Sequence, residues 1–407
     1  MAKLIFVLRV IASIIMAGSV IAIAGVMPDT ARSLPGSSIP QPVDIWQAVS
    51  GLFILLLSGI ASAFTGYLIV RYEALHARWS HDPVGTGPHK NHAKPTPRIG
   101  GFGLMAGLFV SGAALVAIET GVFRVQFGYL LLAGLPAFLG GFTEDVTRKL
   151  GVRARLMCTM LAAACGVWLL GAVLPRLDVP GVDTLLMWTP FAIAFTVFAV
   201  GGVAHAINII DGYNGLAGGH AVIVLAALAY VSAQVGDGFV FTSALVMIGA
   251  LLGFLAWNYP KGKIFLGDGG AYLTGFWLAE ISVLLVVRHP EVSPWFPLLL
   301  LAYPVFETLF SMYRRTVILG RSSGEPDRLH LHQVIYIRLD RGSAGTADPV
   351  LITRRNSRVA PYIWGLSLCC CLPAILFWNE TPLLAASSLV FCVGYIWLYR
   401  KIRRSDS

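Results

Sequence analysis

Six acidic and amide residues stand at the ends of long apolar segments, and their side chains are suited to hold a metal ion. They are Glu144, Asp145, Asn208, Asp211, Asn214 and Asp268. Oxygen donors without a Cys–His cluster favour a hard cation such as Mg²⁺, with Mn²⁺ as a substitute. Mg²⁺ usually completes its shell with water and substrate phosphates. This composition therefore predicts chemistry on a phosphorylated substrate.

Glycines and basic residues accompany these acids, as phosphate chemistry requires. Gly212 and Gly215 follow Asp211, and glycines flank Asp268, so the backbone can approach a phosphate closely. The nearby cations include Lys149, Arg153, Arg155, Lys261 and Lys263. Acids, a divalent ion and basic clamps are the components of phosphoryl transfer. The ordinary alternative for each acid is a helix cap or an ion pair with a neighbouring arginine.

The elements that must position these residues are membrane-spanning helices. Of the 407 residues, 56% are hydrophobic and 13% are charged, which is about half the charge of a soluble domain. A span needs about 20 mainly apolar residues. We expect an all-α polytopic bundle of eleven or twelve spans with cytoplasmic catalytic loops. The candidate spans are 4–27, 48–71, 99–119, 127–142, 157–175, 186–206, 217–234, 238–257, 270–288, 296–316, 361–378 and 382–399.

The positive charges predict how the bundle is oriented. With a cytoplasmic N-terminus, all but five of the 30 Lys and Arg residues fall on the inner side. The exceptions are Arg9, Arg32, Arg124, Arg176 and Arg288. Because such residues gather on cytoplasmic loops, we expect both termini and the acidic residues at the cytoplasmic face of a bacterial inner membrane. The net charge of +9 then requires no nucleic acid, since a basic inner face suits membrane lipids and phosphorylated substrates.

The chain divides into three parts on this map. Residues 1–47 hold the first span and an outside loop, 48–340 a catalytic membrane domain, and 341–407 the rest of the last cytoplasmic loop and the C-terminal spans. The first span, with Lys3 and Arg9 around an apolar run, is compatible with a signal peptide or an uncleaved anchor. The uncleaved anchor is the favoured interpretation.

Five motifs in order resemble the polyprenyl-phosphate N-acetylhexosamine-1-phosphate transferases, which begin lipid-linked cell-envelope glycans. They are Lys90-Asn91-His92 with Pro97-Arg98-Ile99-Gly100-Gly101, Phe142-Thr143-Glu144-Asp145, Asn208-Ile209-Ile210-Asp211-Gly212-Tyr213-Asn214-Gly215-Leu216-Ala217, Phe265-Leu266-Gly267-Asp268-Gly269-Gly270 and Asp327-Arg328-Leu329-His330-Leu331-His332. The resemblance runs from about residue 48 to residue 340. A single motif of this kind is weak evidence, but five in sequence, each on an inner loop, are strong.

The resemblance implies that an N-acetylhexosamine-1-phosphate passes from a UDP-sugar to undecaprenyl phosphate, with release of UMP and use of Mg²⁺. It makes Asp268 the principal metal ligand and Asn208 a second ligand. Glu144 and Asp145 would position or deprotonate the carrier phosphate, although a phosphate monoester is already largely dianionic at pH 7. Asp211 joins these catalytic acids. The implied substrate contacts are Lys90, His92, Arg98, Arg153, Arg155, Asn214, Lys263, Arg328, His330 and His332.

Two departures from the family pattern bear on the type of substrate. Glu144 stands where the family usually has Asp, and Gln333 stands where a third histidine is frequent. The missing histidine favours the GlcNAc or O-antigen branch, or a common-antigen glycan, over the phospho-muramoyl-pentapeptide branch. That branch, a transporter of a small solute, and assembly as a homodimer stay open. A CDP-alcohol phosphatidyltransferase is disfavoured, because its Ala-Arg run does not follow Asp211-Gly212.

Overall fold

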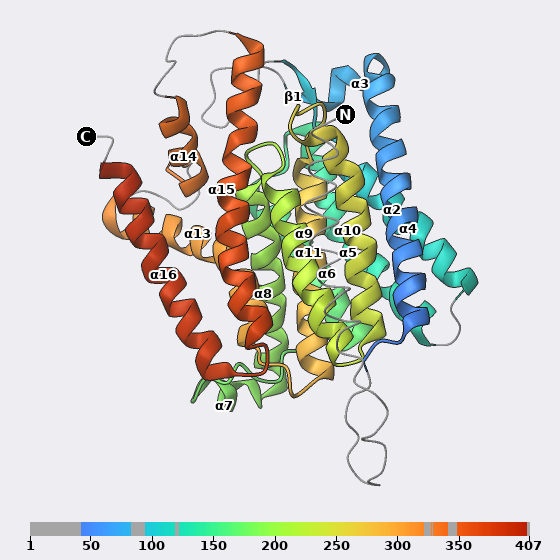
Figure 1. Ribbon diagram of the computed structural model, residues 1–407, viewed down its shortest axis with the longest axis vertical. Coiled ribbons are helices and arrows are strands. Elements are labelled where there is room, and N and C mark those ends of the chain that lie inside the picture. The colour runs from blue at the N-terminus through green and yellow to red at the C-terminus, as the bar shows by residue number, and fades with distance from the viewer. Residues whose placement is uncertain are drawn as a thin grey trace.

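The protein is an all-α bundle, which confirms the fold class predicted from the apolar segments (Figure 1). The computed structural model describes residues 42–82, 94–118, 122–320, 327, 329–340 and 348–404. Within these residues, nine helices are long and apolar enough to cross a membrane. These nine helices are α2 (Ile45–Arg71), α5 (Val122–Thr147), α6 (Val152–Leu170), α8 (Thr189–Ile210), α9 (Leu216–Gln234), α10 (Gly238–Asn258), α11 (Gly267–Arg288), α15 (Pro349–Leu376) and α16 (Thr381–Arg404). Helix α4 (Gly101–Ile118) is a shorter apolar helix.

The shorter elements lie at the ends of the bundle or interrupt it. They are α3 (Glu73–Ser80), β1 (His81–Asp82), β2 (Thr96–Pro97), α7 (Val182–Leu186), α12 (Trp295–Leu300), α13 (Ala302–Tyr313), the π-helix η1 (Arg314–Ile318) and α14 (Leu331–Asp340). The two strands pair antiparallel, with His81 opposite Pro97. Figure 1 shows α3, β1 and α14 at one end of the bundle and α7 at the other.

Two of the predicted spans differ from the observed helices, and a third lies outside the described residues. The segment 296–316 is not one span, because α12 ends at Leu300 and α13 begins at Ala302. Pro304 lies in the first turn of α13, where its missing N–H is tolerated, whereas inside a continuous helix its ring would meet the carbonyl of residue 300. The span at 127–142 is longer than expected, since α5 begins at Val122 and ends at Thr147 and is not interrupted by Pro136. The span at 4–27 lies outside the described part of the chain.

Helix α11 forms the centre of the bundle and fixes the level of the site. Almost all of its residues are buried, and it packs against α5, α8 and other helices. Small residues let the surrounding helices approach closely, as at α2 and α10, where Ser58 Oγ donates to the Val246 carbonyl at 2.8 Å. A Cβ on Gly249 would lie 2.1 Å from the Leu55 carbonyl oxygen. Helices α2 and α10 are therefore in close contact along this part of the bundle.

Candidate active site

Asp268, in the first turn of α11, is the centre of a charged cluster contributed by four parts of the chain. Its Oδ1 accepts hydrogen bonds from Asn208 Nδ2 on α8 at 3.1 Å and from Arg98 Nη2, just before α4, at 3.2 Å. Its Oδ2 pairs with Arg155 of α6. Three residues that are far apart in sequence therefore meet at the carboxylate of Asp268, and two of them, Arg98 and Asn208, come from different motifs.

Asp145, at the end of α5, holds the start of α11 in place. Its Oδ1 accepts from the backbone N–H of Asp268 at 2.9 Å, and its Oδ2 accepts from that of Gly269 at the same distance. These N–H groups have no partner within the helix, and the positive end of the helix dipole favours a carboxylate there. Arg98 Nη2 also lies 3.4 Å from Asp145 Oδ1. Asp145 thus fixes the backbone that carries Asp268.

Glycines in or beside three motifs allow these segments to touch. Gly267 has a φ of +75°, and a Cβ there would lie 2.1 Å from the Arg98 carbonyl oxygen. A Cβ on Gly141 would lie 2.4 Å from the carbonyl carbon of Asp268, and one on Gly101 would lie 2.6 Å from the Gly270 nitrogen. Backbone therefore packs on backbone around Asp268, as only glycine allows.

Asp211 follows the last residue of α8, beside the same cluster. Burial, and then the negative charge of Asp268, raise the pKa of Asp211 to about 7, while Arg98 acts in the opposite direction. Among the described residues, its carboxylate has no hydrogen-bond donor. Burial alone would lower the pKa of Arg98, but Asp145 and Asp268 outweigh it and leave the pKa raised. The site thus pairs an excess of carboxylates with two guanidinium groups.

The turn after Asp211 is fixed by helices that carry none of the motifs. The N–H of Asn214 donates to Asn356 Oδ1 of α15 at 2.8 Å, and the N–H of Gly215 donates to Asn258 Oδ1 at 2.6 Å. The Asn214 side chain itself donates to the Pro260 carbonyl at 3.3 Å. Asn214 therefore binds protein backbone. Sequence reasoning missed Asn258 and Asn356, because a single Asn near a helix end gives no distinguishing signal.

The two histidines of the last motif have different surroundings. His332 Nδ1 lies 3.1 Å from Tyr303 Oη, and its Nε2 lies 3.5 Å from a Cβ built on Gly212. The His332 ring also packs edge-on against Tyr213. His330, by contrast, stacks behind His332 and directs Nδ1 to Glu307 Oε1 at 2.9 Å. Of the two, His332 is the one that adjoins the turn at Asp211.

Glu307 anchors, from within the bundle, the segment that contains His330 and His332, which is called the histidine segment below. It is fully buried in α13, and its Oε2 accepts from Tyr395 Oη of α16 at 2.6 Å and from the N–H of Leu331 at 3.1 Å. Three groups thus surround one carboxylate, which is how a buried charge is tolerated. The sequence places Glu307 within the predicted span 296–316, but gives no sign of Tyr395 as its partner.

Arg314 and Gln333 complete this anchor. Arg314 pairs with Asp327 and donates to the Leu329 carbonyl at 2.7 Å and to Tyr399 Oη at 2.6 Å. Burial would raise the pKa of Asp327, but Ser311, His330 and Arg314 outweigh it and lower that pKa. Gln333, where a third histidine was expected, accepts from the N–H of His330 at 3.1 Å and so caps α14.

Comparison with known proteins assigns the family. Residues 127–286 match the model of glycosyl transferase family 4, a stretch that contains Asp145, Asp211 and Asp268. Undecaprenyl-phosphate alpha-N-acetylglucosaminyl 1-phosphate transferase of Yersinia pestis is 30% identical over 60% of this chain and 67% of its own length. The chain belongs to glycosyl transferase family 4. The family predicted from the five motifs is thereby confirmed, and with it the prediction of a membrane-embedded phosphoglycosyltransferase.

Two further relatives of this family 4 chain bear on its substrate. A probable undecaprenyl-phosphate N-acetylglucosaminyl 1-phosphate transferase of Bacillus subtilis is 29% identical over 60% of this chain and 66% of the relative. A phospho-N-acetylmuramoyl-pentapeptide-transferase of Pelotomaculum thermopropionicum is 34% identical over 48% of this chain and 64% of the relative. Both branches of the family are therefore represented among its relatives.

Several residues predicted for the site of this family 4 protein lie away from Asp268 or are engaged elsewhere. The Arg153 side chain is exposed, and Lys263 lies over the Trp257 ring at 5.1 Å. Glu144 Oε2 accepts from the N–H of Leu150 at 2.7 Å. The Glu side chain, one methylene longer than Asp, thus reaches the loop that follows α5. The remaining three predicted contacts, Lys90, His92 and Arg328, lie outside the described residues.

The donors around Asp268 fit a magnesium ion that is shared with a substrate. In the described part of the chain, no three His, Cys, Asp or Glu side chains form a group that could hold a metal ion by themselves. Mg²⁺ is commonly bound by one or two carboxylates together with phosphate oxygens and water. Asp268 and Asp211, whose carboxylate accepts no hydrogen bond from the described residues, supply two carboxylates, and Asn208 adds an amide oxygen.

Proposed function

We propose that this family 4 enzyme transfers N-acetylhexosamine-1-phosphate from a UDP-sugar to undecaprenyl phosphate, releasing UMP and starting a lipid-linked cell-envelope glycan. The observation that carries the proposal is the convergence of Arg98, Arg155 and Asn208 on Asp268. This cluster joins a carboxylate and two phosphate-binding guanidiniums at one helix N-terminus. The names of the Yersinia and Bacillus relatives support the same donor and carrier.

In the proposed reaction, a phosphate oxygen of undecaprenyl phosphate attacks the β-phosphorus of the UDP-sugar. The new P–O bond forms as the bond between the β-phosphorus and the oxygen shared with UMP breaks, and that oxygen leaves with the electron pair. Arg98 and Arg155 bind the diphosphate and offset its charge. Mg²⁺, held by Asp268 and Asn208, would neutralise charge on the leaving UMP.

The other site residues act by position in this proposal. Asp145 holds the α11 N-terminus and keeps Arg98 in place, and no general base is needed for a carrier phosphate that is already ionised. Asp211 completes the oxygen-rich side of the pocket. His332, beside Gly212, contacts the sugar or the diphosphate, while His330 supports His332 from behind.

The isoprenoid chain of the carrier is proposed to lie in an apolar groove between α5 and α6. This groove has a volume of about 840 Å³, and Thr143 and Leu150, which neighbour the acidic pair, lie among its lining residues. Leu161 also lines it and is exposed. Leu161→Trp should raise KM for undecaprenyl phosphate several-fold and leave KM for the UDP-sugar unchanged. Leu389→Trp, on exposed α16, is the matched control; equal effects of the two variants would contradict this placement.

The end of the bundle that carries Asp268 is proposed to face the cytoplasm, because the Lys and Arg residues gather on that side of the sequence map. Lys261→Cys at this end and Met187→Cys at the other end both replace exposed residues. A membrane-impermeant thiol reagent should label position 187 in intact cells and position 261 only after permeabilisation. The reverse pattern would overturn the orientation.

A UMP-release assay with purified protein tests the reaction. It contains undecaprenyl phosphate, Mg²⁺ and a panel of UDP-GlcNAc, UDP-GalNAc and UDP-MurNAc-pentapeptide. UMP should be released with a UDP-N-acetylhexosamine, and Asp268→Asn should abolish release while the protein still inserts and folds. Near-normal turnover of that variant would remove Asp268 from its role. Turnover with UDP-MurNAc-pentapeptide alone would assign the second candidate, which the Pelotomaculum relative favours and the helix-capping Gln333 disfavours.

A further inference from the structure

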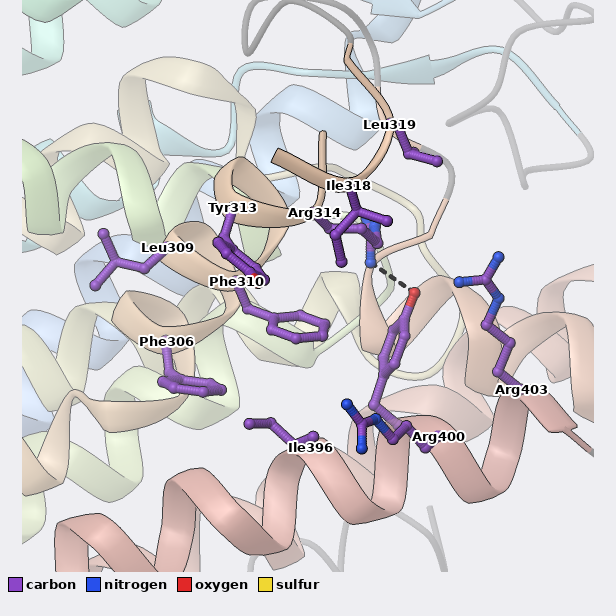
Figure 2. Close-up of a pocket in the computed structure, with 11 residues that line it drawn as sticks. Phe306, Leu309, Phe310, Tyr313, Arg314, Ile318, Leu319, Ile396, Arg400 and Arg403 are labelled. Carbon is purple, nitrogen blue, oxygen red and sulfur yellow. Dashed lines mark hydrogen bonds between the residues drawn. The ribbon is translucent and has the colours of Figure 1, made fainter. Parts of the chain in front are cut away.

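A second groove lies between α13, η1 and α16 (Figure 2). It has a volume of about 860 Å³. Apolar side chains line most of it, and three arginines are the only charged ones. The lining residues are Phe306, Leu309, Phe310, Tyr313, Arg314, Ile318, Leu319, Ile396, Tyr399, Arg400 and Arg403.

The apolar part of this groove opens toward the hydrocarbon of the bilayer. Helix α16, which forms one wall, buries only 11% of its apolar window inside the protein. Leu309 on the facing wall is 58% exposed. In a membrane protein, exposed apolar surface of this kind is covered by lipid acyl chains. A groove of this volume can hold one acyl chain at a fixed position.

The charged end of the groove contains two guanidinium groups that no described side chain neutralises. Figure 2 shows Arg400 and Arg403 projecting from α16 at the end of the groove away from Phe306 and Leu309. Both side chains are exposed, and neither has an ion-pair or hydrogen-bond partner among the described residues. Arg314, in contrast, is engaged by Asp327, Leu329 and Tyr399.

We propose that this groove binds one anionic phospholipid of the leaflet on the active-site side, with an acyl chain along Phe306, Leu309 and Ile396 and the phosphate on Arg400 and Arg403. Guanidinium groups bind phosphate oxygens in bidentate fashion, and basic clusters at the end of a span attract anionic lipids. A net negative headgroup complements the two uncompensated charges better than a zwitterionic one. The site is distinct from the α5–α6 groove assigned to the substrate.

Occupancy of the groove acts on the histidine segment through shared residues. Tyr399 lines the groove and also donates to the Leu329 carbonyl at 3.0 Å, one residue before His330. Arg314 joins the same wall to Asp327. A bound lipid therefore packs against the two side chains that hold the segment in place, and it stabilises the arrangement in which His332 adjoins Gly212.

Binding is measured by native mass spectrometry of the purified full-length protein titrated with phosphatidylglycerol or phosphatidylcholine. Wild-type protein should bind one phosphatidylglycerol preferentially. The double variant Arg400→Gln/Arg403→Gln should bind it roughly thirtyfold more weakly. Lys401→Gln is the control, because it removes one positive charge from the same helical turn but from a side chain that lies over Trp397 and does not line the groove. That control should bind as wild type does.

A second variant tests the apolar part independently of charge. Leu309→Trp fills the groove and should reduce binding of phosphatidylglycerol with both arginines in place. Equal binding of the two lipids by wild type, or unchanged binding by the double variant, would overturn the proposal. Competitive displacement of phosphatidylglycerol by undecaprenyl phosphate would overturn it too, because the groove would then belong to the carrier. None of these results depends on UMP release, so the proposed reaction can fail separately.

Discussion

A buried carboxylate that caps a helix from a neighbouring helix places the first residues of that helix with little freedom. Asp145 is such a group, because both of its oxygens accept backbone N–H groups of α11. In Asp145→Asn, the amide offers one acceptor and turns an NH₂ group toward the second N–H. An unsatisfied buried donor costs about 1–3 kcal/mol, so the free energy of unfolding should fall by that amount. UMP release should fall roughly 100-fold, since Asp268 and Arg98 are both displaced.

The control for this prediction is Asp348→Asn. Asp348 also caps a helix, accepting from the N–H of Val350 at 2.9 Å, but it is exposed. Asn is as good a cap as Asp at such a position, so the free energy of unfolding should change by less than about 0.5 kcal/mol. If urea titrations gave the two variants equal stability, capping by Asp145 would be unimportant.

Gly267 shows how a motif glycine serves the geometry of the site. Its φ of +75° disfavours any side chain, and the nearest atoms to an added Cβ are the Arg98 carbonyl and the Asp145 carboxylate. Gly267→Ala should therefore lower the free energy of unfolding by about 2 kcal/mol or more and abolish UMP release. Gly202→Ala is the control, because no atom lies within 4 Å of that Cβ. It should be neutral or stabilising, by up to about 1 kcal/mol. Comparable losses in both variants would contradict this account.

For single residues, the sequence predicts which side chains gather at the candidate site better than it predicts their contacts. Asp268, Asp145 and Arg98 were identifiable because charged groups beside apolar segments are costly and rarely incidental. The tasks of Asn214 and Glu144 depend on a partner, Pro260 or Leu150, whose approach is a property of the fold. A sequence pattern records which side chain is present, and it does not record which backbone group that side chain reaches.

Among the elements, α13 shows most clearly what hydropathy conceals. The segment 296–316 is apolar enough for a span, but α12 ends at Leu300 and a new helix, α13, begins at Ala302 with Pro304 in its first turn. The break brings Glu307 and Arg314 beside the segment that contains His330 and His332. The averaged hydrophobicity of a segment predicts that it is buried in the membrane. It does not show where a helix ends and the next one begins.

Helix α16 should therefore influence the site although it carries none of the five motifs. Tyr395 Oη donates to Glu307 Oε2, and Glu307 in turn holds His330. Tyr395→Phe removes one buried hydrogen bond to a carboxylate and should lower the free energy of unfolding by about 1.5–3 kcal/mol. In UMP-release kinetics, kcat should fall about tenfold, because His332 loses the support of the stacked His330 ring.

Tyr362→Phe on α15 is the matched control for that experiment, because its side chain is exposed and has no hydrogen-bond partner in the described part of the chain. It should leave both stability and kcat at wild-type values. A Tyr395→Phe enzyme with unchanged kcat and reduced stability alone would limit α16 to a structural role.

For the whole molecule, one end of the bundle gathers the charged motifs while the other end is fastened by a smaller ionic group. Helix α11 begins at Gly267, beside Asp268, and ends at Arg288, so His289 lies at the end opposite the site. There Asp237, which caps α10, accepts from His289 Nε2 at 3.2 Å and lies 3.5 Å from Arg288. The alternation of charged loops in the sequence predicted two such ends, but the partners within each end are set by which helices pack together.

This ionic group gives the molecule a pH dependence of stability that does not involve the site. The hydrogen bond to Asp237, against the effect of burial, raises the pKa of His289 above its ordinary value of 6.5. Burial would raise the pKa of Asp237, but His289 and the Val240 N–H outweigh burial and lower that pKa. The stabilisation by the Asp237 carboxylate is therefore lost only when the pH falls below the usual range of carboxylate pKa values. A histidine with a raised pKa stabilises the fold fully below pH 6.5, and that stability is lost as pH rises through the folded-state pKa.

Between pH 6 and pH 8.5, the detergent-solubilised protein should lose about 0.5 kcal/mol from this pair, a fall in Tm of roughly 1–2 °C. Differential scanning fluorimetry should find this component of the fall absent in His289→Gln and partly retained in Glu291→Gln, which removes only the second partner of His289. A His289→Gln protein whose Tm falls as steeply with pH as that of wild type would show that the pair does not stabilise this end of the bundle.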